Sequence, residues 1–153
     1  MPSSSWQRIL GAIIYLLPWC DSLAFGTQLF IDFPFFQWLV IPALPIIFIR
    51  RGIPFGGLLL FLGLFIGVVR NQQIPGFIRF NVLQALLLDI AITLINYAFE
   101  LFVKPLGIDL ISKTLSSTVF MALLAIIIFS MVENIKGNEP DLPWISEAVK
   151  MQL

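Results

Sequence analysis

Four polar side chains recur at helical spacing inside the longest apolar run of the chain: Asp89, Thr93, Asn96 and Glu100. At 100° per residue the spacing i, i+4, i+7, i+11 places all four within about 60° of one another, which predicts one polar stripe along a helix. A carboxylate or amide that faced lipid near the bilayer centre would cost on the order of 2–3 kcal/mol. The stripe is therefore expected to face protein or a wet cavity.

Two kinds of chemistry suit such a stripe. Asp89 and Asn96 can hydrogen-bond a neighbouring helix as glue while Glu100 reaches the headgroups, or the stripe can line a hydrated path or a protein-conducting surface. Asn81 and Gln84 lie three residues apart on another face, near the interface, where we expect them to cap or anchor the helix. The residues leave both interpretations of the stripe open.

Catalytic and metal chemistry have little support in the residues. The chain has no His, and its single Cys20 cannot form an internal disulfide, so a zinc site or a Cys/His nucleophile would lack ligands or base. The acids Asp21, Asp89 and Glu100 show no pairing typical of a catalytic dyad. Nine basic residues balance nine acidic ones, which gives no reason to expect nucleic acid as a partner. We expect neither an enzyme nor a cofactor or metal.

The helices that carry these residues belong to a membrane protein. The 153 residues are 59% hydrophobic and only 12% charged, and their mean hydropathy is +0.97, whereas soluble domains average roughly 25% charged residues. The composition predicts an all-α, polytopic helical protein forming one membrane domain with the lipid bilayer around it. Four transmembrane segments are expected, at about 9–24, 55–69, 79–103 and 114–132. The basic residues divide almost evenly between the two sides, so orientation is not predicted.

The apolar run 35–49 is the weakest candidate, and it makes a fifth span an alternative. It is short for a span of about 20 residues and holds Pro42 and Pro45, each of which removes a helix hydrogen bond. A kinked partial span or a re-entrant segment suits it as well as a full crossing. The span 55–69 is long enough if Arg50, Arg51 and Arg70 reach the headgroups at its ends.

Small residues suggest where helices pack. Gly56, Gly63 and Gly67 recur at i, i+7, i+11, so they share a face that would admit a second backbone closely. After residue 133 the chain becomes polar, and the tail 134–153 is expected to leave the membrane and form a short amphipathic helix on its surface. A single polar face can line only part of a path. Other membrane-protein subunits are therefore expected as partners, and a translocating polypeptide is a candidate occupant.

Several stretches together resemble a known family. These are "YLLP" followed by Asp21, the block "VRNQQIPGFIRFNVLQALLLDI" at 69–90, "TLSSTVF" at the start of the last span, and "ISEAVKMQL" at the end. In this order they resemble the channel-type subunit of the translocon at the plastid inner envelope, the twenty-kilodalton Tic component, and its cyanobacterial relatives. The arginine-phenylalanine-asparagine block before the glutamine-alanine-leucine helix is the most specific part.

The resemblance implies an all-helical protein with four spans that works with other membrane subunits in moving polypeptides across the plastid inner envelope. It brings no catalytic residues. Because no transit peptide precedes the spans, the chain resembles a plastid-encoded or cyanobacterial homologue, which implies either the plastid inner envelope or a cyanobacterial membrane. Two alternatives to a translocation or insertion subunit remain: a scaffold or assembly factor of a larger membrane complex, and a small-solute transporter.

Overall fold

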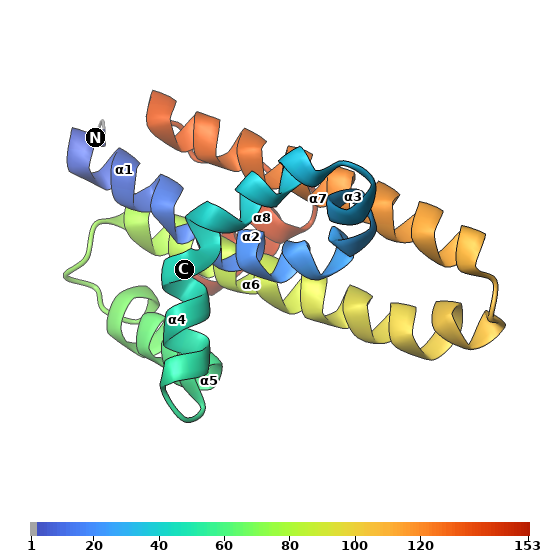
Figure 1. Ribbon diagram of the computed structural model, residues 1–153. Helices are drawn as coiled ribbons and strands as arrows, with labels where there is room; N and C mark the ends of the chain where they lie inside the picture. Colours follow the sequence, from blue (N-terminus) through green and yellow to red (C-terminus); the bar gives the residue numbers. More distant parts are fainter. Residues whose placement is uncertain (1–2) are drawn as a thin grey trace.

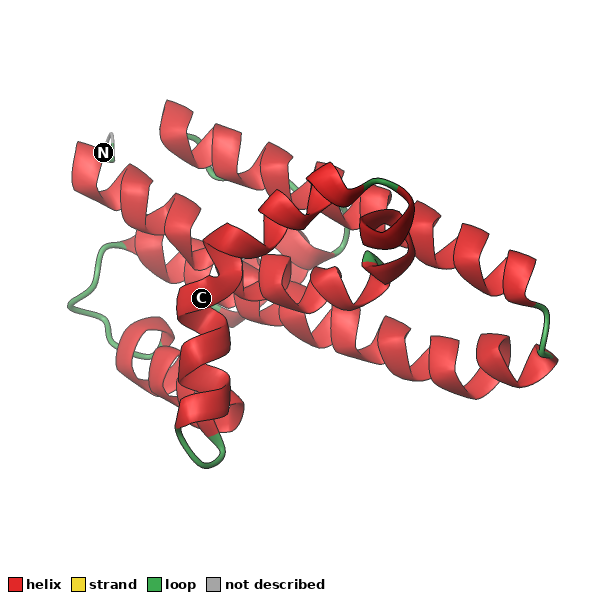
Figure 2. Cartoon of the chain, in the orientation of Figure 1, coloured by secondary structure: helices red, strands yellow, loops and turns green. Residues whose placement is uncertain are grey.

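In the computed structural model, which describes residues 3–153, the chain is built from helices joined by short turns, and no strand occurs within this range (Figures 1 and 2). The same range contains four helical stretches that are long and apolar enough to cross a membrane: Ser5–Phe25, Pro34–Gly52, Gly76–Leu106 and Asp109–Lys136. The predicted class, an all-α polytopic membrane protein with four segments of spanning length, is confirmed.

The first of these stretches bends at Tyr15, between α1 (Ser5–Ile14) and α2 (Leu16–Ser22). Pro18 stands in the first turn of α2, where it has no N–H to donate to the preceding turn and its ring crowds that turn. The amide of Tyr15 bonds the carbonyl of Ala12 instead, in a tighter turn, with an N–O distance of 3.2 Å. A one-turn 3₁₀ segment, Leu23–Phe25, ends this stretch.

The two longest helices form an antiparallel pair. The first is α6 (Gly76–Ala98), continued by a π-helical turn (Phe99–Val103) and a 3₁₀ turn (Lys104–Leu106), and the second is α7 (Asp109–Lys136). The reversal between them uses Gly107 at φ 69°, a left-handed conformation that favours glycine. The helix α7 ends in a Schellman turn at Gly137, φ 91°, in which the amides of Gly137 and Asn138 bond the carbonyls of Asn134 and Glu133.

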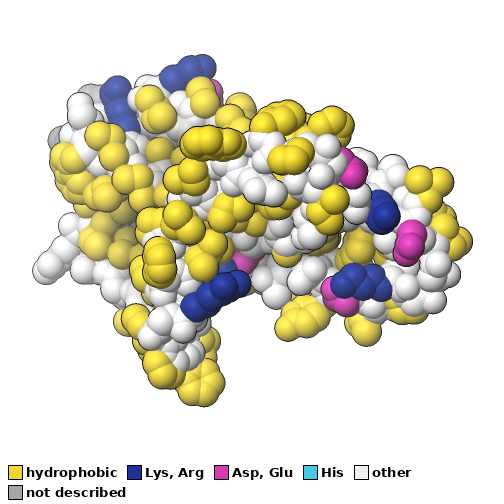
Figure 3. All heavy atoms as spheres, viewed as in Figure 1, with side chains coloured by type: hydrophobic (Ala, Val, Ile, Leu, Met, Phe, Trp, Pro, Cys, Tyr) yellow, Lys and Arg dark blue, Asp and Glu magenta, His cyan; other side chains and the backbone are white. Residues whose placement is uncertain are grey.

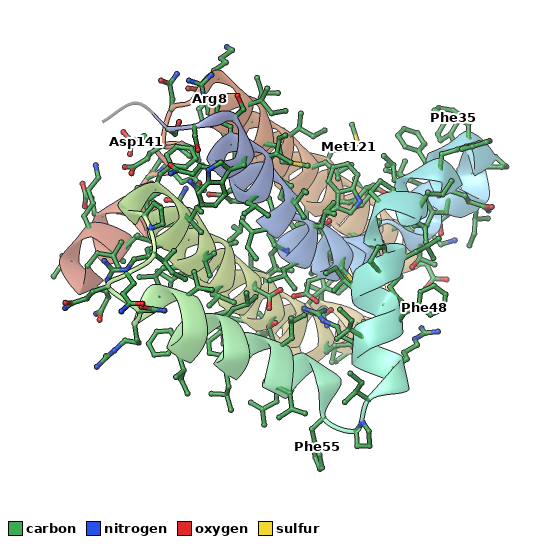
Figure 4. All side chains as sticks on the ribbon, turned by 90° about the vertical axis from the view of Figure 1, so that its left-hand side faces the viewer. Arg8, Phe35, Phe48, Phe55, Met121 and Asp141 are labelled. Carbon is green, nitrogen blue, oxygen red and sulfur yellow. The ribbon has the colours of Figure 1, made fainter. Side chains whose placement is uncertain are left out.

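The part of the chain between the first stretch and α6 turns across the bundle. After α3 (Thr27–Asp32), a 3₁₀ segment (Pro34–Ala43) leads into α4 (Leu44–Gly52), and a short turn joins α4 to α5 (Gly56–Leu64), which a π-helical turn (Phe65–Val69) extends. Pro42 lies inside the 3₁₀ segment and Pro45 in the first turn of α4, where a missing N–H is tolerated. In Figures 1 and 4 α4 runs across the direction of α6, with Phe48 and Phe55 pointing away from the bundle.

The lengths of the two uncertain segments differ from the sequence expectation. Pro34–Gly52 has 19 residues and passes the length and composition expected of a span, whereas Gly56–Val69 is a shorter apolar helix. The prolines do not interrupt the first of them, because its first part is a 3₁₀ helix with i→i+3 hydrogen bonds. A 3₁₀ helix also rises by about 2.0 Å per residue, so it spans more distance than an α-helix of the same length. Which of the two crosses the bilayer stays a prediction, as does the re-entrant alternative for 35–49.

Two buried clusters hold the elements together. The larger lies between α2, α6 and α7 and includes Tyr15, Phe25, Ile92, Phe120 and Ile127. The second lies between α5, α6 and the C-terminal helix α8 (Ile145–Gln152) and includes Leu17, Phe80, Leu86 and Val149. Many large apolar side chains are exposed on the outer surface, and Figure 3 shows them spread over one face, which suits a lipid environment.

The polar tail returns to the bundle. Its helix α8 begins at Ile145, and Ser146 and Val149 on its inner side are buried. The helix packs against α6, so its apolar side contacts protein where the sequence suggested the membrane surface. The periodicity of the tail predicts a helix but does not say which apolar surface the helix covers.

Candidate functional site

The predicted polar stripe lies on α6 and on the π-helical turn that follows it. Asp89 is mostly buried, with 16% of its side chain exposed, whereas Thr93 and Glu100 are exposed and Asn96 is half-buried. The hydroxyl of Thr93 donates to the carbonyl of Asp89 at 2.9 Å, and Lys104 pairs with Glu100 at 2.5 Å. The four side chains therefore share no common partner. Within the described part of this chain, Thr93 and Glu100 do not hydrogen-bond a neighbouring helix.

Asp89 belongs instead to an ion cluster drawn from three helices. Arg50, in the last turn of α4, forms an ion pair with Asp21 of α2, and its Nη2 lies 3.5 Å from Oδ1 of Asp89 on α6. Each of the three side chains is no more than about a quarter exposed, at 25%, 19% and 16% for Arg50, Asp21 and Asp89. We call these residues the Arg50 cluster. It ties the transverse α4 to the bundle.

The Arg50 cluster lies near the middle of the longest span. Asp89 is 13 residues after Gly76 and 17 before Leu106 in the 31-residue helical stretch (89 − 76 = 13; 106 − 89 = 17). At 1.5 Å per residue these are about 20 and 26 Å, in a hydrocarbon core of about 30 Å. Charges at this depth are costly unless they are paired or wet. Pairing with Arg50 offsets part of the cost of burying Asp21 and Asp89. Because one cation faces two acids, one carboxylate remains in excess.

Three hollows border the stripe. The first, of about 630 Å³, is lined by the Arg50 cluster together with Thr93 and Tyr97. The second, of about 240 Å³, is lined by Cys20, Asp21, Thr93 and Asn96. The third, of about 290 Å³, is lined by Asn96, Glu100, Lys104 and Lys113. All four predicted stripe residues thus stand on the walls of these hollows.

A second polar cluster, which we call the Tyr15 network, lies nearer the start of α6 and is buried. The Tyr15 hydroxyl donates to Oδ1 of Asn81 at 3.1 Å and accepts from Nε2 of Gln84 at 3.0 Å. Gln84 also donates to the Pro140 carbonyl at 3.0 Å and accepts from the Ser146 hydroxyl at 2.5 Å. These side chains are between 0 and 1% exposed. Of the two expected roles, capping is wrong, because Asn81 and Gln84 instead anchor the first span and the tail to α6.

The glycine face is divided in the structure. A Cβ at Gly56 would lie 2.2 Å from the carbonyl oxygen of Ile49, so the α4–α5 turn needs glycine there. A Cβ at Gly63 or Gly67 would meet none of the described residues within 4 Å. The π-helical turn over Phe65–Val69 also changes the angular spacing on which the shared face was based. Contact of Gly63 and Gly67 with a second helix stays a prediction, and any such helix belongs to another chain.

Sequence reasoning missed the role of Arg50. The run lengths placed Arg50 with Arg51 in the headgroups, but its guanidinium turns inward while Arg51 is exposed. The signal was present in Asp21 and Asp89, two acids in apolar runs that each require a cation. Among residues 3–153, no group of three or more His, Cys, Asp or Glu side chains is arranged to hold a metal ion.

The fold and the charged residues within its spans define an integral, polytopic helical membrane protein. A family model described as "Chloroplast import apparatus Tic20-like" matches residues 2–149. The chain therefore belongs to the Tic20 family, which confirms the resemblance drawn from its motifs. As a member, it is an integral membrane protein of a plastid or cyanobacterial membrane.

Similar proteins come from cyanobacteria, red algae and plants. A Tic20 family protein of Synechocystis is 34% identical over 148 residues, which cover 96% of this chain and 92% of that protein. The chloroplastic protein TIC 20-v of Arabidopsis thaliana is 33% identical, over 96% of this chain and 71% of its own length. The Tic20 family protein Ycf60 of Gracilaria tenuistipitata is 32% identical, over 94% of this chain and 74% of its own length.

Proposed function

We propose that this chain is a membrane subunit of a machinery that translocates or imports proteins. The observation that carries the proposal is the match of nearly the whole chain to the family described as chloroplast import apparatus. The polar stripe supports it, because an extended polypeptide in a membrane needs hydrogen-bond partners for its backbone and side chains. Thr93 and Asn96 on α6 and Glu100 on the turn that follows it offer such partners along the walls of the hollows.

The chain is proposed to work within a larger assembly. A helix is roughly 10 Å across, and one polar stripe on one helix can line only part of a path wide enough for a polypeptide. Other subunits or further copies must supply the remaining walls. Gly63 and Gly67 support this, since both are small and exposed. A Cβ at either position would meet no other part of the described chain within 4 Å.

Photo-crosslinking tests contact with a polypeptide. A photoreactive amino acid at Asn96 is expected to crosslink to a precursor protein arrested during import into native membranes, because Asn96 lines two of the hollows. The same amino acid at Met121, which is 50% exposed and points away from the bundle in Figure 4, is the control and should give no adduct. Equal labelling at both positions, or none at Asn96 in active membranes, would contradict the proposal and favour a scaffold.

Assembly through the exposed glycines is tested by a double substitution. Gly63→Leu with Gly67→Leu is expected to lower the yield of complexes co-purified in mild detergent by about tenfold, because two added side chains hold a partner backbone away. The monomer should keep its stability, since neither position contacts the rest of the described chain. Gly63→Ala with Gly67→Ala is the matched control and should assemble normally. Unchanged complexes in the leucine variant would contradict docking at this face.

A further inference from the structure

The three hollows beside the stripe adjoin one another, because neighbouring hollows share lining residues. The hollow at the Arg50 cluster shares Asp21, Thr93 and Tyr97 with the hollow at Cys20. That hollow in turn shares Ala24 and Asn96 with the one near Lys104. Together they follow α6 from the level of Asp89 to its C-terminal end. We call this feature the polar groove.

One end of the polar groove is open because the first span stops short. The stretch that contains α2 ends at Phe25, which packs on Phe99, whereas α6 continues to Leu106 and α7 begins only at Asp109. Beyond Phe25 no part of the first span covers the ends of α6 and α7, which project together at the right of Figure 1. This end of the groove is polar and is lined by Gln28, Glu100, Lys104, Ser112, Lys113 and Ser116.

The polar lining of the groove ends at the Arg50 cluster. From Ala85 to Leu88 the inner side of α6 is apolar and buried, with Ala85, Leu86 and Leu88 between 0 and 3% exposed. Beyond them the Tyr15 network is sealed by the returning tail through Ser146 and Pro140. The next hollow shares Phe61 and Ile90 with the one at the Arg50 cluster, but it is lined mainly by apolar side chains. A polar path therefore runs from the α6–α7 turn to about the middle of the membrane and ends there.

The side of the polar groove faces outward between α5 and α6. Leu58, Leu94 and Tyr97 form this rim and are 58%, 63% and 63% exposed. The floor carries charge, since Asp21 and Asp89 outnumber Arg50 by one carboxylate. An apolar rim over a polar floor suits an occupant with both kinds of side chain.

We infer that the polar groove is a water-filled binding site, open on one side of the membrane only, for polypeptide segments that keep apolar side chains in lipid while basic or neutral polar ones enter the groove. The excess carboxylate at its inner end disfavours acidic side chains. The chain thus offers half a crossing to its substrate, and it does not form a path through the membrane by itself. This inference rests on the proposed function for the identity of the occupant, but the one-sided hydration stands on the geometry alone.

Thiol labelling of the purified full chain in sealed proteoliposomes tests the geometry. In a Cys20→Ala background, Thr93→Cys should react with a charged, membrane-impermeant thiol reagent only from the side that also labels Leu106→Cys. It should not react from the side that labels Gln72→Cys, in the loop at the other end of α6. Native Cys20, which lines the groove, should react from the same side as Leu106→Cys.

Met121→Cys is the depth-matched control. Thr93 precedes Gly107 by 14 residues and Met121 follows it by 14 (107 − 93 = 14; 121 − 107 = 14), so the two lie at similar depth on antiparallel helices. Met121 lines none of the three hollows, and its reaction should be at least about tenfold slower, because a thiol in hydrocarbon does not ionise. Protection of Thr93→Cys, or its labelling from both sides, would overturn the inference.

The class of occupant is tested with two synthetic peptides that share one apolar stretch and differ only in a Lys-containing or Glu-containing flank. The Lys peptide should slow the labelling of Thr93→Cys. The Glu peptide should need a concentration about tenfold higher to slow the labelling equally. Equal protection by the two peptides, or none, would overturn the assignment of substrate class. Labelling from one side without crosslinks from Asn96 in native membranes would instead keep the hydrated groove and reject the import function.

Discussion

Replacing Arg50 with alanine is expected to destabilise the protein by about 3 kcal/mol, because two carboxylates then remain inside the membrane domain without their cation. Asp21 and Asp89 come from α2 and α6, and Arg50 alone joins them to α4 within the described chain. Breaking a fully buried pair costs about 3–5 kcal/mol, and the partial exposure of these three side chains lowers the expected value. The α4–α5 hairpin should loosen first.

The measurement is the fraction of monomer that survives heating in detergent, followed by size-exclusion chromatography. Arg51→Ala is the matched control, since Arg51 is the next residue, carries the same charge and is exposed without an ion pair in the described chain. Arg50→Ala combined with Asp21→Asn and Asp89→Asn should recover part of the loss, because no unpaired charge then remains. If Arg50→Ala survives heating as well as Arg51→Ala does, the Arg50 cluster does not hold α4 in place.

The polar stripe shows how far periodicity alone can reach. Apolar content and a 3.6-residue period were enough to predict helices, spans of the right length and a row of polar residues at 89, 93, 96 and 100. They also indicated that an acid at the depth of Asp89 needs protein or water beside it. The structure places that acid next to Arg50, which is 39 residues away in the chain. No local pattern specifies a partner at that separation.

The same limit explains the errors at Asn81, Gln84 and the tail. A helical wheel places Asn81 and Gln84 on one face but does not show that residues 140–146 fold back onto it, 56 to 62 residues later. Turn chemistry gave a partial signal, because Gly137 sits at the end of α7 where a chain reversal is common. The predicted glycine face does not pack within the chain for another reason. The prediction assumed a regular α-helix through Phe65–Val69, whereas the structure has a π-helical turn there.

Replacing Gln84 with leucine is expected to release the C-terminal tail from the bundle. Its side-chain amide bonds the Tyr15 hydroxyl, the Pro140 carbonyl and the Ser146 hydroxyl, and all of these groups are buried. A buried polar group that loses its partner costs about 1–3 kcal/mol. The Ser146 hydroxyl and the Pro140 carbonyl keep each other as partners but lose their bonds to α6, so the tail should open locally while the spans stay folded.

Hydrogen exchange of the amides in Ile145–Gln152 measures this opening. In Gln84→Leu their exchange should accelerate by about a hundredfold, which corresponds to roughly 2.8 kcal/mol of lost docking energy. Ser146→Ala should also accelerate exchange, because its hydroxyl bonds Gln84, the Pro140 carbonyl and the Leu142 amide. The matched control is Gln72→Leu, at an exposed glutamine in the loop before α6. If exchange in Gln84→Leu matched this control, the apolar contacts of Val149 would be what docks the tail. The hydrogen bonds of Gln84 would then not be needed to hold it.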